Sequence, residues 1–236
     1  MEVQHLPRLW LHQAGTLFWP HRCPGCGRPL TDPGESVCLR CLFELPRTGF
    51  LQQPHNPVEM LFWGRTPVDA AGSLFYFSRG SAMQRILHAL KYRGNRQAGV
   101  RLGRSLGEAI GASGRFSPID AIIPVPLHPE REKIRGYNQA ECIARGIAVA
   151  TGWPVWTGLV NRIRQTDTQT RKNRIERWSN LSDGFRLSRP EQVAGKHLLI
   201  VDDVITTGAS LEACAHGILQ ASPAKLCIAT IAYATQ

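Results

Sequence analysis

Beyond about residue 65 the chain alternates short apolar segments with helical segments, and this alternation constrains the fold more than any other feature. Apolar runs of strand length lie at 69–77, 119–127, 196–203 and 224–234. Segments with helical character separate them, at 81–92, 99–111, 137–152 and 209–221. Because strands that alternate with helices form a parallel sheet covered on both faces, the sequence predicts an α/β domain of that architecture.

Several of these segments carry apolar spacing or end signals that indicate whether they are helices or strands. The segment 81–92 has its apolar residues at helical intervals. They are Met83, Ile86, Leu87 and Leu90. The segment 137–152 ends at Gly152, in a position where glycine commonly caps a helix. The segment 119–127 is closed by prolines, so it reads as a buried strand that enters a loop.

The composition changes near residue 65. Residues 20–65 are rich in cysteine, proline and glycine and have few periodic runs. A chain of 236 residues with 43% hydrophobic content can bury one sizeable core and a smaller module. We therefore predict two parts: residues 1–65, an N-terminal segment with a double-zinc-ribbon-like four-cysteine module, and residues 66–236, the α/β domain.

The chain contains no candidate membrane span or signal peptide. No apolar run reaches the length of about 18 residues that a span needs. The first 20 residues are apolar in places, but Pro7, Arg8 and His12 interrupt them and no small-residue cleavage site follows. The sequence favours a cytoplasmic protein whose start forms an amphipathic docking helix.

Four of the seven cysteines form a cluster with metal-ligand spacing. Cys23 and Cys26 form one C-x-x-C pair, and Cys38 and Cys41 form the second after eleven intervening residues. Two such pairs converge tetrahedrally on one ion, and Zn²⁺ suits four thiolates. The alternatives are two disulfides, which a reducing compartment disfavours, or four free thiols. The site would be structural, with no open coordination position.

The stretch "LLIVDDVITTGAS" (198–210) has the features of a ligand site. Four apolar residues form a central strand, and Asp202 and Asp203 follow where that strand ends, at the edge where open α/β sheets bind ligands. Carboxylates there suit ribose hydroxyls or a hydrated Mg²⁺. The small, hydroxyl-rich residues 206–210 lead into a helix, whose free N–H groups and dipole attract anions. The string predicts a ribose-phosphate site, whereas each residue alone would fit an ordinary helix cap.

A P-loop, the nearest competing motif, is excluded. That motif requires G-x-x-x-x-G-K-[ST] before a helix. The Gly-Lys pair of this chain, Gly195 and Lys196, is followed by His197 and precedes a strand.

The positive charge points to polyanionic partners. The formal net charge is +10, and residues 130–180 hold ten basic against five acidic residues, with Tyr137, Trp153, Trp156 and Trp178 among them. Basic side chains with stacking aromatics are typical of single-strand nucleic-acid surfaces. The same residues could hold a small phosphorylated ligand or form a solvated surface.

Taken together, these segments resemble a known family. The stretch 198–210 resembles the phosphoribosyl-diphosphate (PRPP) motif of type I phosphoribosyltransferases. The segments "IPVPLHPEREKIRGYNQAE" (123–141), "LHALKYRG" (87–94) and 164–180 with the following Phe185 resemble the ComF/GntX family of competence protein F-like proteins. The four-cysteine module is also a trait of that family, so the resemblance covers nearly the whole chain.

The resemblance implies roles for particular residues. Asp202 and Asp203 would be the catalytic pair and would hold the ribose hydroxyls, directly or through Mg²⁺, while the turn after Pro124 would face the pyrophosphate. The residues implied in PRPP or phosphate binding are Asp202, Asp203, Thr206, Thr207, Gly208, Ala209, Ser210, Lys91 and Arg135. Lys91 has an alternative role as a favourable charge at a helix C-terminus. The residues implied in a mobile loop or in nucleic-acid contacts are Arg164, Gln169, Arg171, Lys172, Arg174 and Arg177.

Two functions remain open from the sequence. The first is a Mg²⁺-dependent phosphoribosyltransferase, a pentosyl-transferring enzyme that acts on PRPP and an acceptor. No segment of the sequence has the character of a nucleobase-recognising element. The second is a non-catalytic protein that handles single-stranded DNA during DNA uptake, with a partner in the competence machinery.

Overall fold

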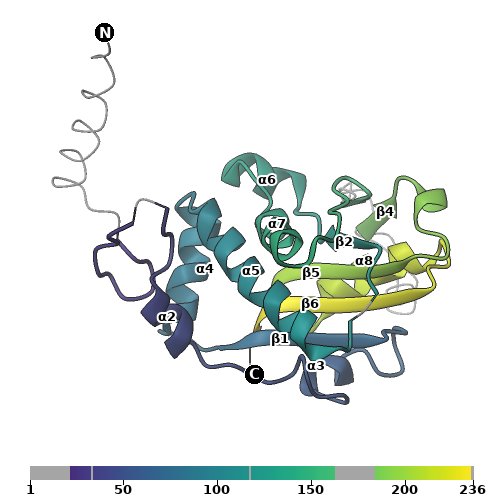
Figure 1. Ribbon diagram of the computed structural model, residues 1–236. Helices are drawn as coiled ribbons and strands as arrows, with labels where there is room; N and C mark the ends of the chain where they lie inside the picture. The colour runs from purple at the N-terminus through teal and green to yellow at the C-terminus, as the bar shows by residue number, and fades with distance from the viewer. Residues whose placement is uncertain (1–21, 33, 117, 163–183, 235–236) are drawn as a thin grey trace, which may run out of the picture.

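The computed structural model describes residues 22–32, 34–116, 118–162 and 184–234. Its centre is a parallel sheet with the strand order β1-β6-β5-β2 (Figure 1). The strands are β1 (Ala70–Phe77), β2 (Ala121–Pro124), β5 (His197–Ile205) and β6 (Lys225–Ala234). A separate antiparallel pair joins β3 (Val160–Arg162) to β4 (Phe185–Leu187). The predicted α/β architecture is confirmed.

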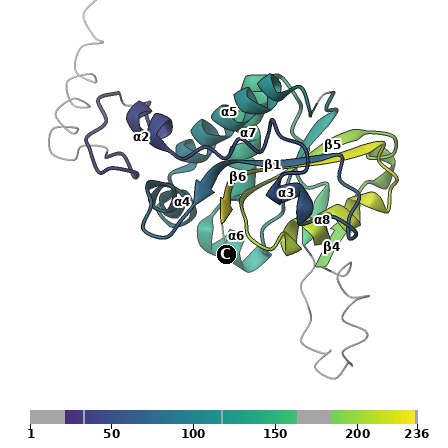
Figure 2. The same ribbon diagram turned by 90° about the horizontal axis from the view of Figure 1, so that it is seen from below.

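Helices cover both faces of the sheet (Figure 2). The helices are α2 (Leu39–Glu44), α3 (Pro57–Met60), α4 (Ala82–Tyr92), α5 (Arg96–Ser113), α6 (Pro129–Arg135), α7 (Gln139–Thr151) and α8 (Ala209–Leu219), with a 3₁₀ turn at Pro190–Gln192. Alternate residues of β5 point into the two hydrophobic cores, one on each face of the sheet. Leu199 and Val201 pack with α4, α5 and α7, while Leu198 and Ile200 pack with α3 and α8. This period of two explains why the central strands read as continuous apolar runs.

Side chains and glycines set the helix ends. The Ser81 hydroxyl accepts the Gln84 N–H at 3.1 Å at the start of α4, and the Asn138 side chain accepts the Ala140 N–H at 2.9 Å at the start of α7. Gly152 ends α7 with φ 75°, which confirms the cap expected there. The sequence does not predict helix α6, because the segment 119–127 reads as a strand that enters a loop and the next expected helix begins at residue 137. Helix α6 buries none of its residues, so no apolar periodicity marks it.

Helices α5 and α7 cross at close range because glycines line their contact. A Cβ placed on Gly103 would lie 2.1 Å from the Ile143 carbonyl oxygen. A Cβ placed on Gly146 would lie 2.1 Å from the Val100 carbonyl oxygen. The two backbones therefore touch directly, and no larger side chain fits between them.

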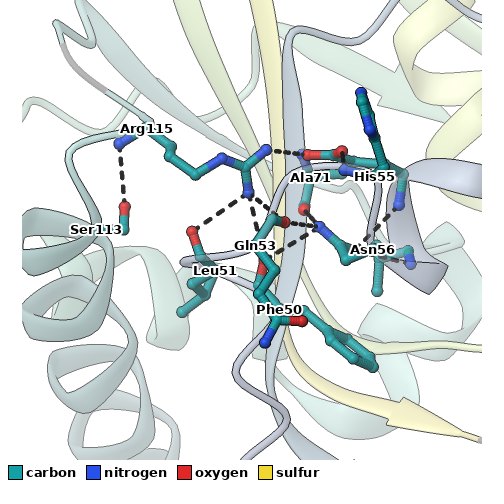
Figure 3. Close-up of polar contacts among 10 residues, drawn as sticks. Phe50, Leu51, Gln53, His55, Asn56, Ala71, Ser113 and Arg115 are labelled. Atoms are coloured by element: carbon teal, nitrogen blue, oxygen red, sulfur yellow. Dashed lines mark hydrogen bonds and ion pairs between the residues drawn. The ribbon is translucent and has the colours of Figure 1, made fainter.

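The connector between the cysteine cluster and β1 is fastened to the sheet by a buried polar network (Figure 3). The Asn56 amide donates to the carbonyls of Phe50, Gln53 and Ala71 at 2.8–3.1 Å, and its oxygen caps α3. Arg115 forms an ion pair with Glu59 and donates to the Gln53 carbonyl. Because the donors and acceptors satisfy one another, Asn56 and Glu59 are buried with their polar groups paired.

The four-cysteine cluster shares a core with the helices. Cys23, Val37 and Cys41 are buried in the same cluster as Met83 and Ile86 of α4. The scattered cysteines Cys142, Cys214 and Cys227 are buried, as expected for small apolar residues. The division of the chain at residue 65 stays a prediction. Among the described residues, no helix is long and apolar enough to cross a membrane.

Candidate functional site

Two cavities meet at the carboxyl end of β5. The smaller, of about 100 Å³, is lined by the last part of β5 and the turn after it, from Asp202 to Leu211 with the exception of Asp203. The larger, of about 180 Å³, contains both aspartates. Asp202 and Ser210 line both cavities, so the acid pair and the hydroxyl-rich turn line two adjoining cavities.

Backbone hydrogen bonds orient the two carboxylates. The Asp203 N–H donates to Asp202 Oδ1 at 2.8 Å, and the Val204 N–H donates to Asp203 Oδ1 at 2.9 Å. The Asp203 side chain is 6% exposed. Asp202 is partly exposed and lines the mouth of both cavities. The strand end thus presents two carboxylates whose positions the main chain holds.

Burial raises the pKa of the Asp202 carboxyl well above its ordinary value, to about 8, and the neighbouring Asp203 charge adds to the shift. The Asp203 backbone N–H and the Lys91 charge act in the opposite direction. A cation or a donor that enters the site favours the ionised form.

The turn 206–210 forms the smaller cavity. Gly208 has φ 78°, a left-handed conformation that favours glycine, and it caps the N-terminus of α8. The Thr207 hydroxyl accepts the Ala209 N–H at 3.5 Å. The free N–H groups of the first helical turn and the hydroxyls of Thr206, Thr207 and Ser210 lie around one space, which is an arrangement that accepts an anion.

Basic residues form the far wall of the larger cavity. Lys91, at the end of α4, approaches Asp203 Oδ2 with its Nζ at 2.5 Å. Arg135 of α6 lines the cavity and hydrogen-bonds to Gln139. The structure therefore brings Lys91 and Arg135 to the acid pair, and their contacts with a ligand stay predictions. The sequence does not predict four more lining residues: Tyr92, Arg131, Gln139 and Arg162.

One of these residues could have been found from the sequence. Arg131 lies four positions before Arg135, so a helix places both on one face. That helix carries capping signals at both ends, with Pro129 at its start and Gly136 directly after it. Tyr92 and Arg162 reach the cavity only through the packing of α4 and β3.

The segment predicted as a mobile loop or nucleic-acid contact lies outside the described residues. It includes Arg164, Gln169, Arg171, Lys172, Arg174 and Arg177. The described residues show a second concentration of charge. Residues 78–115, mainly α4 and α5, hold eight basic residues against one acid, and Arg22, Arg85 and Arg93 line a groove of about 580 Å³ beside the cysteine cluster.

The four cysteines could hold a metal ion. Their sulfur atoms all lie within 4.8 Å of one another, and the pairs Cys23–Cys41 and Cys26–Cys38 are each 3.7 Å apart. Sulfurs about 2.3 Å from a tetrahedral Zn²⁺ would lie about 3.8 Å from each other. A disulfide requires about 2 Å, so these thiols are free. The donor set and its spacing therefore fit zinc.

Comparison with protein families agrees with this architecture. A family model described as "Phosphoribosyl transferase domain" matches residues 143–236, which include the acid pair and the turn 206–210. A solved structure of glutamine PRPP amidotransferase from B. subtilis also matches, with 20% sequence identity and a TM-score of 0.43. That match covers 58% of this chain and 26% of the amidotransferase chain.

Three curated proteins are similar to this chain, two of them over most of its length. The DNA utilization protein YhgH of Escherichia coli K12 is 30% identical over 193 residues, which are 80% of this chain and 74% of that protein. Competence protein ComFC of Bacillus subtilis is 26% identical over 85% of this chain and 72% of its own. Competence protein F of Haemophilus influenzae is 37% identical over 93 residues, 39% of this chain and 41% of that protein.

Proposed function

Because this chain belongs to the family of DNA utilization protein YhgH and competence protein F, with a phosphoribosyltransferase domain, we propose that it binds PRPP or a related ribose 5-phosphate together with Mg²⁺. We further propose that it transfers the phosphoribosyl group to an acceptor. One observation carries the proposal: the acid pair and the anion-accepting turn line two adjoining cavities near the end of a single strand.

In this proposal each part of the cavity takes one part of the ligand. The turn 206–210 holds the 5′-phosphate through backbone N–H groups and hydroxyls, supported by the positive end of the α8 dipole. Asp202 and Asp203 hold the ribose hydroxyls. Lys91, Arg131, Arg135 and Arg162 line the remaining wall, where they would neutralise the diphosphate. The chain contributes positioning and charge stabilisation as the diphosphate departs from an oxocarbenium-like sugar.

The residues present fit Mg²⁺. Asp203 Oδ2 is a buried carboxylate oxygen whose one close partner among the described residues is the Lys91 ammonium, and Asp202 offers a second carboxylate beside it. Hard oxygen donors of this kind are the ligands that Mg²⁺ prefers, and the ion usually shares them with a phosphorylated substrate. When bound, the ion would supply positive charge to the diphosphate.

Calorimetric titration with PRPP and Mg²⁺ tests this function. The variants Asp202→Asn and Asp203→Asn are expected to bind PRPP at least tenfold more weakly than wild type, because an amide cannot replace a charge-assisted contact worth about 1.5–3 kcal/mol. The matched control is Asp120→Asn, a partly exposed aspartate that contacts the opposite end of β5 through the His197 N–H. It should bind normally.

Unchanged PRPP affinity in both site variants, or no PRPP binding by wild type, would contradict the proposal. Pyrophosphate release from PRPP, measured with a panel of bases and amines, then separates binding from transfer. Release with at least one acceptor is expected if the chain is an enzyme.

A second candidate function is the handling of single-stranded DNA. It is supported by the charge of residues 78–115 and by the groove of Arg22, Arg85 and Arg93. Tyr92, 68% exposed, lies directly before Arg93 and also lines the larger cavity, so an exposed ring that could stack on a base lies beside basic residues. The names of the relatives, which refer to DNA utilization and competence, point in the same direction.

Fluorescence anisotropy with a single-stranded oligonucleotide at several salt concentrations tests this second candidate. Charge reversal by Arg93→Glu is expected to weaken binding and to lower the salt slope by about 1 for each phosphate that the protein no longer neutralises. Charge reversal at Arg171, Lys172 and Arg174 is expected to act in the same way. Lys225→Glu changes the net charge equally at the amino end of β6 and should leave binding nearly unchanged. Equal effects of Arg93→Glu and Lys225→Glu would count against a specific surface.

A further inference from the structure

Lys91 is the cation that the protein itself supplies to the acid pair. Its Nζ lies 2.5 Å from Asp203 Oδ2, and the two side chains are 26% and 6% exposed. Among the described residues, no other lysine or arginine lies within ion-pair distance of Asp202 or Asp203. The neighbouring arginines of the cavity are Arg131, Arg135 and Arg162, so the aspartate charge is balanced by one lysine in a basic wall.

The two oxygens of Asp203 are held in different ways. Oδ1 accepts a hydrogen bond from the Val204 backbone, which is part of a central strand. Oδ2 is buried and has no hydrogen bond of acceptable geometry in the described part of the chain, although the Lys91 ammonium is close to it. The first oxygen is fixed, whereas the second depends on electrostatic attraction to a flexible side chain. Such a contact can be exchanged for another cation without disturbing the strand.

A lysine suits an exchangeable contact better than an arginine. Its ammonium is a compact charge with rotatable donors on a four-carbon stem, whereas a guanidinium binds carboxylates as a rigid fork. When the ammonium leaves Asp203, it stays in a cavity whose lining offers three guanidinium groups and one further carboxylate. That carboxylate is Asp202, which the entering cation would share with Asp203, so the displaced charge needs an anion from outside the protein.

We propose that Lys91 is an exchangeable counter-ion, which pairs with Asp203 in the ligand-free protein and moves to the diphosphate when the ligand enters. This inference rests on the proposed function, because the ligand must bring both a divalent cation and an anion. A cation alone would have to displace the ammonium and leave it without a partner. The cation and the phosphorylated ligand consequently bind together, and neither binds well alone.

Mn²⁺ binding, measured by electron paramagnetic resonance with and without PRPP, tests the exchange. The variant Lys91→Met is expected to bind Mn²⁺ alone about tenfold more tightly than wild type, since the competing charge is gone. It is expected to bind PRPP with Mn²⁺ about tenfold more weakly, since the diphosphate then has one charge-assisted hydrogen bond fewer. Opposite changes in the two affinities are the mark of an exchanged counter-ion, because a residue that only supports the fold would weaken both.

Two further variants keep the test decisive. Lys91→Arg retains the charge and should bind Mn²⁺ alone as weakly as wild type. Lys196→Met removes an ion pair with Asp120 far from the cavity, and it should change neither the affinity for Mn²⁺ alone nor the affinity for PRPP with Mn²⁺. Unchanged or weaker binding of Mn²⁺ alone to Lys91→Met, or tighter binding to Lys91→Arg, would overturn the inference. If wild type fails to bind PRPP, the proposed function fails, while the titrations with Mn²⁺ alone still decide whether Lys91 competes with a cation.

Discussion

Replacing Gly103 by alanine is expected to destabilise the protein more than the same substitution at any other glycine of α5. The new Cβ would meet the Ile143 carbonyl oxygen at 2.1 Å, and the neighbouring atoms are also backbone, so no side chain can rotate away. Overpacking of a core costs about 1–3 kcal/mol and occasionally more, and this contact belongs at the upper end. We expect a loss of roughly 3 kcal/mol in the free energy of unfolding, measured by urea denaturation, and a melting temperature lower by about 6–12 °C.

A control on the same helix separates this effect from helix propensity. Gly111 also lies in α5, and a Cβ placed there would have nothing within 4 Å. The variant Gly111→Ala should therefore stabilise the protein by about 0.5–1 kcal/mol, because alanine favours the helix over glycine. The variant Gly146→Ala, from the facing helix α7, should behave like Gly103→Ala. A neutral or stabilising result for both Gly103→Ala and Gly146→Ala would show that the two helices do not cross as closely as described.

Removal of the metal is expected to unfold the N-terminal cluster. We expect purified protein to contain one zinc ion per chain, measured by mass spectrometry of the metal. Structural zinc sites contribute about 10–16 kcal/mol in small peptides, so a module of this size is not expected to stay folded without the ion. After chelation, limited proteolysis should cut between residues 22 and 45, while the circular dichroism of the α/β domain is largely retained.

The variant Cys26→Ser tests the same point without a chelator. Cys26 is exposed, so its replacement removes a ligand and little packing, unlike the buried Cys23 and Cys41. The expected result is loss of zinc and the same proteolytic cut. Zn²⁺ should restore protection to the chelated wild type, and Mg²⁺ should not. Full resistance to proteolysis in the metal-free protein would show that the shared core with Met83 and Ile86 holds the cluster on its own.

The predictable parts of the site are those formed by residues that lie close together in the sequence. The run Leu198–Val201 is apolar because this part of β5 is buried on both faces. The aspartates follow in the last part of the strand, which continues to Ile205. Gly208 and Ser210 follow because a tight turn into a helix requires a residue with positive φ and benefits from hydroxyls. The four cysteines also lie close together in the sequence, and their sulfur atoms lie within 4.8 Å of one another in the structure.

The parts that were missed depend on contacts between distant segments or lack periodicity. Helix α6 has capping residues but no buried face, so its sequence lacks the apolar spacing that predicts a helix. The close crossing of α5 and α7 needs glycines on two helices to meet, and neither helix alone shows which glycine will face a carbonyl. Tyr92 and Arg162 come to the cavity from α4 and β3 in the same way.

The sequence by itself determined the alternating α/β architecture, the four-cysteine cluster and the strand end that bears Asp202 and Asp203, because each depends on the order of residues within one short segment. Only the tertiary structure decided what faces the acid pair. The approach of Lys91 to Asp203 joins helix α4 to strand β5. Its physical reason is the burial of the Asp203 carboxylate, which requires a compensating charge from whichever element the packing brings within a few ångströms.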